Sequence, residues 1–420
     1  MSRVLLPPGD KVLFVAWLLL CLISLAVLWS VTEPVRGPYE QTDPGVAKAV
    51  FWRQFVWMLG SWAAFLVAAK VPLRYLEQTS VLWFLASVLL LVLILAVGPR
   101  IGGARRWLVL GPLRLQPSEL AKVAFVLMTA KLLGTAVGEG RRLGPAVLSF
   151  LLMAVPMVLV LREPDLGTSL VFLAIWLGTI FWFGMPGILL IGAGSIVLSA
   201  AIMFYSDIGG KAWPWGVYLI VVIGILYLAP LTTTVRITLL GTNVAAGIGI
   251  PFFWERLKPY QQDRLLAFFD PSRDQFGTGY QAIQSKVAIG QGGLMGTGYL
   301  AGTQKGLAFL PERHTDFIFS VVGEELGFVG AVVVLGLFAA IILRGINHAE
   351  AARRPFASFL AIGVVSYFTF HVVVNVAITT GLLPVTGLPL PLLSYGGSNL
   401  LASSLMLGLL LNVSSRTFDD

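Results

Sequence analysis

The sequence is short of charged residues, cysteine and histidine. Charged side chains make up 12% of its 420 residues, about half the share of roughly 25% that is usual in soluble globular proteins. Its single cysteine excludes an intrachain disulfide, and its three scattered histidines give no metal-ligand pattern. No nucleic-acid-binding pattern is present. The net charge of +8 is therefore expected to serve lipid headgroups or an anionic substrate.

Long apolar runs take the place of charge. Hydrophobic residues make up 57% of the chain, and its mean hydropathy is +0.85. This pattern predicts an all-α polytopic integral membrane protein with about 10–12 transmembrane helices. The predicted spans are 12–31, 51–69, 80–98, 119–134, 144–161, 168–184, 187–204, 213–231, 237–253, 317–343, 356–378 and 398–413. The first is longer than a signal-peptide core, so we expect it to be retained.

An even number of spans places both termini on one side of the membrane, which we expect to be the cytoplasmic side. Lysines and arginines divide almost equally between the two faces, so the positive-inside rule supports this orientation only narrowly. The cations on the outer face therefore need another purpose, which a bound anion would supply.

The chain is predicted to form a single membrane domain, 1–420, with one long polar segment, 254–316. We expect this segment to be an extracytoplasmic loop that carries the chemistry, because long loops in compact proteins are usually functional. Asp274 lies within it, beside Gly277 and Gly279, which allow a tight turn. From the residues alone, Asp274 is either a solvated turn residue or a reactive carboxylate.

A cationic stretch, 98–122, precedes the fourth predicted span. It contains Arg106, and its end is a helix start that places Glu119 and Lys122 on one face. These cations either bind substrate or extend toward lipid headgroups. Arg53, at the opening of the second span, is by itself typical of an interfacial anchor.

Polar residues also occur between and within the later spans. The charged turn 162–165 is typical of an interfacial anchor. Segment 381–399 contains three prolines and cannot be a continuous helix. It is expected either to line a cavity, which Ser398 would face, or to be an outer loop folded back for packing. His371 and Asn375, four residues apart, favour hydrogen bonds between helices.

Several ordered blocks of sequence are recognisable together. They are Ala104–Lys122 (ARRWLVLGPLRLQPSELAK), Arg162–Ser169 (REPDLGTS), Tyr260–Gln284, Phe309–Gly327 and Gly381–Ser398 (GLLPVTGLPLPLLSYGGS). The chain resembles the SEDS family (shape, elongation, division and sporulation), whose members polymerise the glycan strands of bacterial peptidoglycan. It departs from the family pattern in two ways. Gln275 replaces the usual proline after Asp274, and 187–253 is expected to hold two spans beyond the family's number.

The resemblance implies that lipid II, an undecaprenyl-pyrophosphate disaccharide-peptide, is polymerised into a β-1,4 glycan by an inverting single displacement. It implies that Asp274 is the general base and that Arg53, Arg106 and Lys122 surround the pyrophosphate or donor sugar. Glu119 would orient Lys122, and Ser398 would belong to the substrate-binding residues. The sequence shows no closed set of metal ligands, and no cofactor is certain. Assistance of the reaction by a divalent cation, Mg or Mn, stays an open alternative.

The resemblance further implies a bacterial cytoplasmic membrane protein with both termini in the cytoplasm. Its partner would be a class B penicillin-binding protein, which crosslinks the new strand; membrane lipids surround it and nucleic acid is not a partner. The motifs at 302–304 and 309–317 favour an elongation-type member. The alternatives are a division-type polymerase, a flippase or transporter of a lipid-linked sugar, and a scaffold for another synthase.

Overall fold

The structure is a computed structural model of the chain. It describes residues 9–32, 44–100, 104–111, 113–138, 143–185, 187–208, 210–211, 213–256, 262, 266, 268, 278–302 and 314–416. Its helices are α1 (Lys11–Thr32), α2 (Pro44–Lys70), α3 (Leu73–Val97), α4 (Pro117–Thr135), α5 (Leu143–Arg162), α6 (Leu166–Trp182), α7 (Gly187–Ile208), α8 (Trp213–Leu228), α9 (Thr233–Arg256), α11 (Thr278–Gly292), α13 (Ile318–Ala351), α14 (Pro355–Thr379) and α15 (Gly397–Ser415). Two short strands, β1 (Leu108–Leu110) and β2 (Leu113–Leu115), pair in a hairpin.

Each predicted span coincides with a helix, from α1 to α9 and from α13 to α15. Within the described ranges, eight helices are long and apolar enough to cross a membrane, namely α1, α2, α3, α5, α9, α13, α14 and α15. Helices α6 and α8 and part of α7 are apolar but shorter. Helix α4 carries Glu119, Lys122 and Lys131 and is less apolar. The prediction of an all-α polytopic membrane protein is confirmed.

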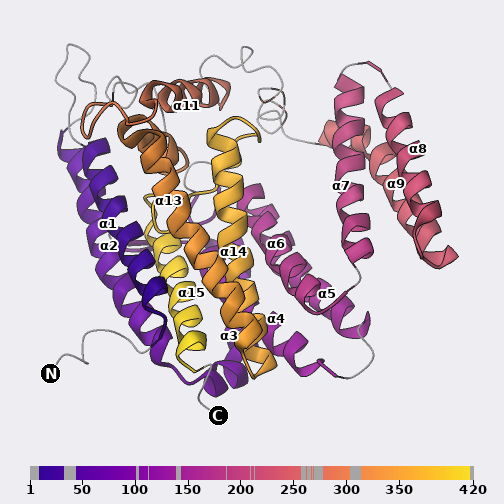
Figure 1. The fold of residues 1–420 in the computed structure, drawn as a ribbon, viewed down its shortest axis with the longest axis horizontal. Coiled ribbons are helices and arrows are strands. Elements are labelled where there is room, and N and C mark those ends of the chain that lie inside the picture. The colour runs from indigo at the N-terminus through magenta and orange to yellow at the C-terminus, as the bar shows by residue number, and fades with distance from the viewer. Residues whose placement is uncertain are drawn as a thin grey trace. The chain divides into compact units, whose positions relative to one another are not determined.

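The larger of two compact units comprises Met1–Trp182 and Ala267–Asp420. In it α2 packs along α15, and α14 packs along α4, α6 and α13 (Figure 1). Helices α4, α14 and α15 are buried on most of their faces. Helices α3 and α5 instead expose many leucines and valines, as lipid-facing helices do. The core of this unit is therefore built around the fourth predicted span.

Helix α11 lies across one end of this unit, and the described ends of the chain lie at the other (Figure 1). The Asp10 backbone N–H, just before α1, donates to Ser414 Oγ near the end of α15 at 3.0 Å. The Asp10 carboxylate also pairs with Arg344 and, at 2.8 Å, with His348 Nε2. The two ends thus lie on one side of the protein, as an even number of crossings requires.

Helix α13 is broken at Gly327, where φ is 65° and ψ is −164°. The loop after α11 fills the break, because the Phe328 N–H donates to the Gly293 carbonyl oxygen at 2.9 Å. A Cβ atom at position 327 would lie 2.2 Å from the Gly296 nitrogen. The break therefore requires glycine for its backbone conformation and for its close approach to the loop.

The smaller unit, Phe183–Leu266, contains α7, α8 and α9. A buried polar cluster ties the three helices together. The Tyr218 hydroxyl donates to Asn243 Oδ1 at 2.9 Å, and Asn243 Nδ2 donates to Ser195 Oγ at 2.9 Å. Such hydrogen bonds between helices suit a membrane interior, where water cannot replace them. That 187–253 adds spans to the family pattern stays a prediction.

The polar segment 254–316 is partly helical. Helix α9 extends to Arg256, and α11 occupies Thr278–Gly292. Asp274 lies outside the described residues. The assignment of the whole segment as an extracytoplasmic loop stays a prediction.

Candidate active site

A hairpin and a helix start bring the cationic stretch to the core. Strand β1 pairs antiparallel with β2, and Gly111 turns the chain between them with a φ of 63°. Gln116 then stands at the N-cap of α4, and Pro117 occupies its first turn. Proline fits there because the first N–H groups of a helix have no partner within the helix.

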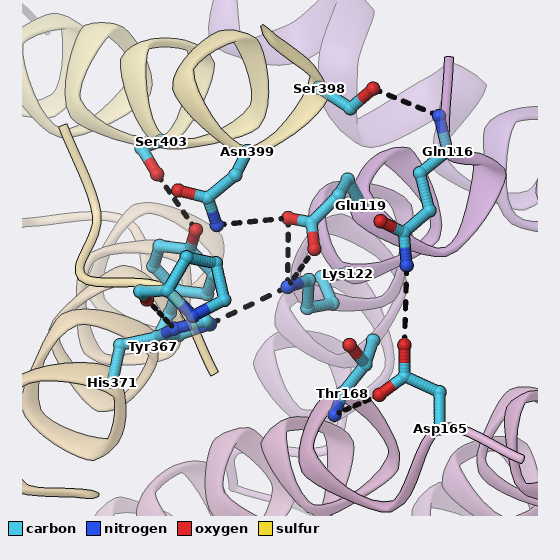
Figure 2. A network of polar contacts seen from close by, with 11 residues as sticks. Gln116, Glu119, Lys122, Asp165, Thr168, Tyr367, His371, Ser398, Asn399 and Ser403 are labelled. Atoms are coloured by element: carbon cyan, nitrogen blue, oxygen red, sulfur yellow. Dashed lines mark hydrogen bonds and ion pairs between the residues drawn. The ribbon is translucent and has the colours of Figure 1, made fainter. Parts of the chain in front are cut away.

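Lys122 and Glu119 form a buried ion pair in the first turns of α4. Lys122 Nζ lies 2.8 Å from both carboxylate oxygens, and the two residues are 0% and 3% exposed. Asn399 Nδ2 donates to Glu119 Oε2 at 3.3 Å, and the Tyr367 ring centroid lies 5.4 Å from Lys122 Nζ (Figure 2). Buried charge is tolerated when it is paired and hydrogen-bonded. The predicted contact across one turn is therefore present, inside the protein.

Helix α14 supplies two more polar side chains. His371 Nε2 lies 3.4 Å from Lys122 Nζ, and its Nδ1 lies 3.1 Å from the Pro389 carbonyl oxygen. Asn375 donates to the Leu388 carbonyl oxygen at 2.7 Å. The predicted hydrogen bonding between helices is present for His371, which meets Lys122 of α4, whereas Asn375 bonds a carbonyl group of the segment between α14 and α15.

The starts of α4, α6 and α15 meet beside this pair. The Gln116 N–H donates to Ser398 Oγ at 2.9 Å, and its side chain donates to Asp165 Oδ2 at 3.3 Å. Asp165 also accepts the Thr168 N–H at 3.0 Å, in the first turn of α6 (Figure 2). Helix N-termini carry partial positive charge. Three of them at one place create an environment that favours an anion.

Arg106 closes one side of this cluster. Its Nε donates to the Glu163 carbonyl oxygen at 2.7 Å, its Nη2 donates to the Pro164 carbonyl oxygen, and its Nη1 lies 3.7 Å from Asp165 Oδ2. The Arg106 side chain is 29% exposed, so its guanidinium is within reach of a ligand from solvent. Burial raises the pKa of the Glu163 carboxyl to about 8; the nearby Asp165 charge also raises this pKa, and Arg106 lowers it.

The turn 162–165 only partly fits an interfacial anchor. Arg162 is exposed, as an anchor requires. Glu163 and Asp165 are instead buried, and Asp165 contacts Arg106 and the first turn of α6. The anchor interpretation is wrong for these two acids.

The predicted site residues fall into three groups. Arg106 is linked to Ser398 through Asp165 and Gln116, and the Glu119 N–H joins the Lys122–Glu119 pair to this network by donating to the Gln116 carbonyl oxygen at 3.1 Å. Arg53 is exposed on α2, and its neighbour Gln54 donates to the Ser394 carbonyl oxygen at 3.3 Å. Asp274 lies outside the described residues. No cluster of three potential metal ligands among His, Cys, Asp and Glu occurs in the described ranges, and a cation at Asp274 stays a prediction.

Sequence reasoning missed four members of the network, namely Gln116, Asp165, Tyr367 and Asn399. Two carried a local signal, because Gln116 precedes the helix-starting Pro117, and Asp165 stands where a helix cap is preferred. Tyr367 and Asn399 carried none, since their partners come from other helices.

The fold and the site together define the class of this protein. It is a polytopic membrane protein that has an anion-favouring site where three helices begin, beside the buried Lys122–Glu119 ion pair. The chain belongs to the FtsW/RodA/SpoVE family, whose model, described as "Cell cycle protein", matches residues 10–213 and 214–418. This is the SEDS family that the sequence blocks indicated.

Relatives give the family's activity. Peptidoglycan glycosyltransferase MrdB of Escherichia coli K12 is 33% identical over 404 residues, covering 96% of this chain and 93% of MrdB. Peptidoglycan glycosyltransferase RodA of Treponema pallidum is 32% identical, covering 95% and 96%. Probable peptidoglycan glycosyltransferase FtsW of Halomonas elongata is 34% identical, covering 96% and 90%. The chain is thus a peptidoglycan glycosyltransferase, which favours the enzyme over the transporter and scaffold alternatives.

Solved structures share the fold. A chain from a study of "structural coordination of polymerization and crosslinking by a peptidoglycan synthase complex" aligns with a TM-score of 0.69 at 32% identity, covering 98% of this chain and 99% of that one. Rod shape determining protein RodA of Thermus thermophilus aligns with a TM-score of 0.62 at 27% identity, covering 98% of each chain. The all-α fold therefore extends over almost the whole chain.

Proposed function

We propose that the chain joins lipid II units into β-1,4-linked glycan at the outer face of the cytoplasmic membrane, in cell elongation. The observation that carries the proposal is the meeting of three helix starts with Arg106 and the buried Lys122. A pyrophosphate is the anionic part of lipid II, and such an environment stabilises it. The elongation role rests on the motifs at 302–304 and 309–317.

The proposed reaction needs a base and a stabilised leaving group. The acceptor 4-hydroxyl oxygen forms a bond to the donor anomeric carbon. The bond from that carbon to the phosphate oxygen breaks, and its electron pair leaves on the pyrophosphate. The hydroxyl proton passes to Asp274, the general base. Attack from the face opposite the leaving group converts the α-linked donor into a β-linked product.

The side chains of the site have different roles in stabilising the negative charge of the leaving group. Arg106 is partly exposed and offers the planar donor pair that suits phosphate oxygens. Lys122 is sealed inside and acts as a fixed positive charge, oriented by Glu119. Ser398 holds Gln116 at the start of α4. Arg53 would approach the substrate from α2.

We further propose that both termini are cytoplasmic and that a class B penicillin-binding protein is the partner. The shared side of the two chain ends supports a common location. The similarity to a chain described with coordinated polymerization and crosslinking supports a crosslinking partner.

Purified protein tests the base. Asp274→Ala and Asp274→Asn are expected to lower the rate of glycan-chain formation from lipid II by at least about a hundredfold, because general-base catalysis contributes roughly 10²–10⁴-fold. Chain products are resolved by gel electrophoresis, and thermal unfolding reports the fold. Asp270→Asn, four residues away in the same segment, is the matched control and should keep the wild-type rate. Polymerisation by both Asp274 variants near that rate would show that another group takes the proton.

A further inference from the structure

Two turns of α14 hold consecutive carbonyl groups of segment 381–396, which joins α14 to α15. His371 and Asn375 are both fully buried, and they contact the carbonyl oxygens of Pro389 and Leu388 at 3.1 Å and 2.7 Å. Asn375 also donates to the Asp316 carbonyl oxygen at 2.9 Å. This face of α14 therefore adds side-chain hydrogen bonds that hold the irregular segment against the helix.

The contacts of His371 define its protonation. A carbonyl oxygen only accepts hydrogen bonds, so the nitrogen facing Pro389, Nδ1, carries the hydrogen. The ammonium of Lys122 only donates, so Nε2, at 3.4 Å, presents its lone pair. Both contacts are satisfied by one neutral tautomer. A doubly protonated ring would place a hydrogen and a positive charge against the ammonium.

Lys122 needs such a partner. Its ammonium sits on a flexible four-carbon stem with three rotatable donors, so its position is set by what surrounds it. Glu119 fixes one direction, the Tyr367 ring lies on another side, and His371 Nε2 provides the remaining directional acceptor (Figure 2). His371 is the one of these three that also contacts segment 381–396.

The same segment is attached to the end of the polar region 254–316. The Tyr395 N–H donates to the His314 carbonyl oxygen at 2.7 Å, and Ser394 Oγ donates to the Thr315 carbonyl oxygen at 2.6 Å. Ser394 Oγ also accepts the Leu390 N–H at 2.8 Å. Hydrogen bonds together with the Pro389–Leu390 peptide bond thus connect Thr315 to His371 and Lys122.

We propose that His371 is a positioning residue, which fixes the Lys122 ammonium through a neutral imidazole and makes its position depend on segment 381–396. The inference rests on the proposed role of Lys122 at the leaving group. It adds that the end of the 254–316 region is connected to the cationic site through segment 381–396.

Substitution of His371 by glutamine or by asparagine tests the two hydrogen bonds of the imidazole ring one at a time. In His371→Gln the side-chain oxygen reaches the place of Nε2 and keeps an acceptor for Lys122, but the donor to Pro389 is lost. In His371→Asn the amide nitrogen takes the place of Nδ1 and keeps the Pro389 contact, but the acceptor is lost. His371→Leu removes both. Thr379→Val is the matched control on α14, because that buried hydroxyl bonds only the carbonyl groups of its own helix.

Steady-state polymerisation of lipid II is measured for each variant, with thermal unfolding in parallel. We expect kcat to fall in the order wild type, Gln, Asn, Leu. The Asn and Leu variants should lose about tenfold to a hundredfold, as for a lost hydrogen bond to a charged group. KM should stay within about threefold, because the leaving-group charge develops in the transition state. Thr379→Val should match the wild type.

Equal losses in the three His371 variants that follow their loss of thermal stability would overturn the proposal, since a purely structural histidine predicts that pattern. An Asn variant as active as the Gln variant, or a Leu variant within about twofold of wild type, would also overturn it. Lys122→Ala distinguishes a failure of the proposed role of Lys122 from a failure of the positioning role of His371. If it polymerises normally, the proposed role of Lys122 is wrong and the inference loses its premise; if it is impaired while the His371 order fails, only the positioning role is wrong.

Discussion

Glu163 shows how a single buried acid is shaped by its place in the fold. Its side chain is fully buried, and neither carboxyl oxygen has a hydrogen-bond partner among the residues that the structure describes. Burial, and secondarily the charge of Asp165, raise the pKa of this carboxyl to about 8 from the usual 4.5. Near neutral pH the group is therefore mostly protonated, and the turn before α6 holds one charge fewer than its sequence suggests.

The raised pKa of Glu163 makes stability depend on pH. Between pH 4.5 and about 8, the folded state keeps a proton that the unfolded state has released. The free energy of unfolding should therefore fall as pH rises, by up to about 1.4 kcal/mol per pH unit. Glu163→Gln cannot ionise and should remove this dependence. Thermal midpoints of the purified protein from pH 5 to pH 9 measure it.

The control for that experiment is Glu350→Gln, because Glu350 is exposed near the end of α13. It should leave the pH dependence of the wild type unchanged. A thermal midpoint that changes equally with pH in the wild type and in Glu163→Gln would show that the carboxyl ionises normally in the folded protein.

At the scale of an element, the break in α13 is held from outside the helix. Gly327→Ala places a Cβ in the left-handed region and 2.2 Å from the Gly296 nitrogen. We expect the free energy of unfolding to fall by roughly 2 kcal/mol or more, since backbone strain of this kind costs about 1–3 kcal/mol before any clash. Thermal or denaturant unfolding in detergent measures the loss.

Gly336→Ala is the matched control in the same helix. No atom lies within 4 Å of a Cβ at that position, and alanine in a helix interior is about 0.5–1 kcal/mol better than glycine. Gly336→Ala should therefore be neutral or stabilising. A Gly327→Ala variant as stable as Gly336→Ala would mean that the two halves of α13 rejoin at little cost.

The elements could be predicted where the signal is local. Hydropathy located the helices, and the spacing of Glu119 and Lys122 predicted their contact, because both depend on a few neighbouring residues. The break at Gly327 could not be predicted, since its freed backbone groups are satisfied by a loop more than 25 residues earlier. Asn399 and Tyr367 likewise approach Lys122 from other helices, and only the packing of α4, α14 and α15 reveals them.

At the scale of the whole molecule, the arrangement of the larger unit defines two opposite ends. The Asp10 contacts place the end of α13 beside the start of α1, whereas α11 lies across the other end (Figure 1). The orientation proposed for the membrane then assigns the α11 end to the outside.

Cysteine labelling tests this orientation. In a Cys21→Ala background, Arg100→Cys and Asp274→Cys should react with a membrane-impermeant maleimide in cells whose outer membrane has been opened. Ala351→Cys should react only after the cytoplasmic membrane is permeabilised. Arg100 and Ala351 are both exposed, so access to solvent on each side decides the result. The Cys21→Ala parent is the control, and labelling of position 351 before position 100 would reverse the proposed topology.

The sealing of Lys122 has a consequence for how the protein attracts its substrate. Mobile ions screen charges on a wet surface within about 8 Å at physiological ionic strength, whereas an interior charge is screened far less. The short-range field of the Lys122–Glu119 pair is therefore little changed in concentrated salt, while the attraction of the partly exposed Arg106 weakens. The long-range attraction of a phosphate to the site should therefore depend on salt concentration. The stabilisation of a phosphate that is already bound there should not.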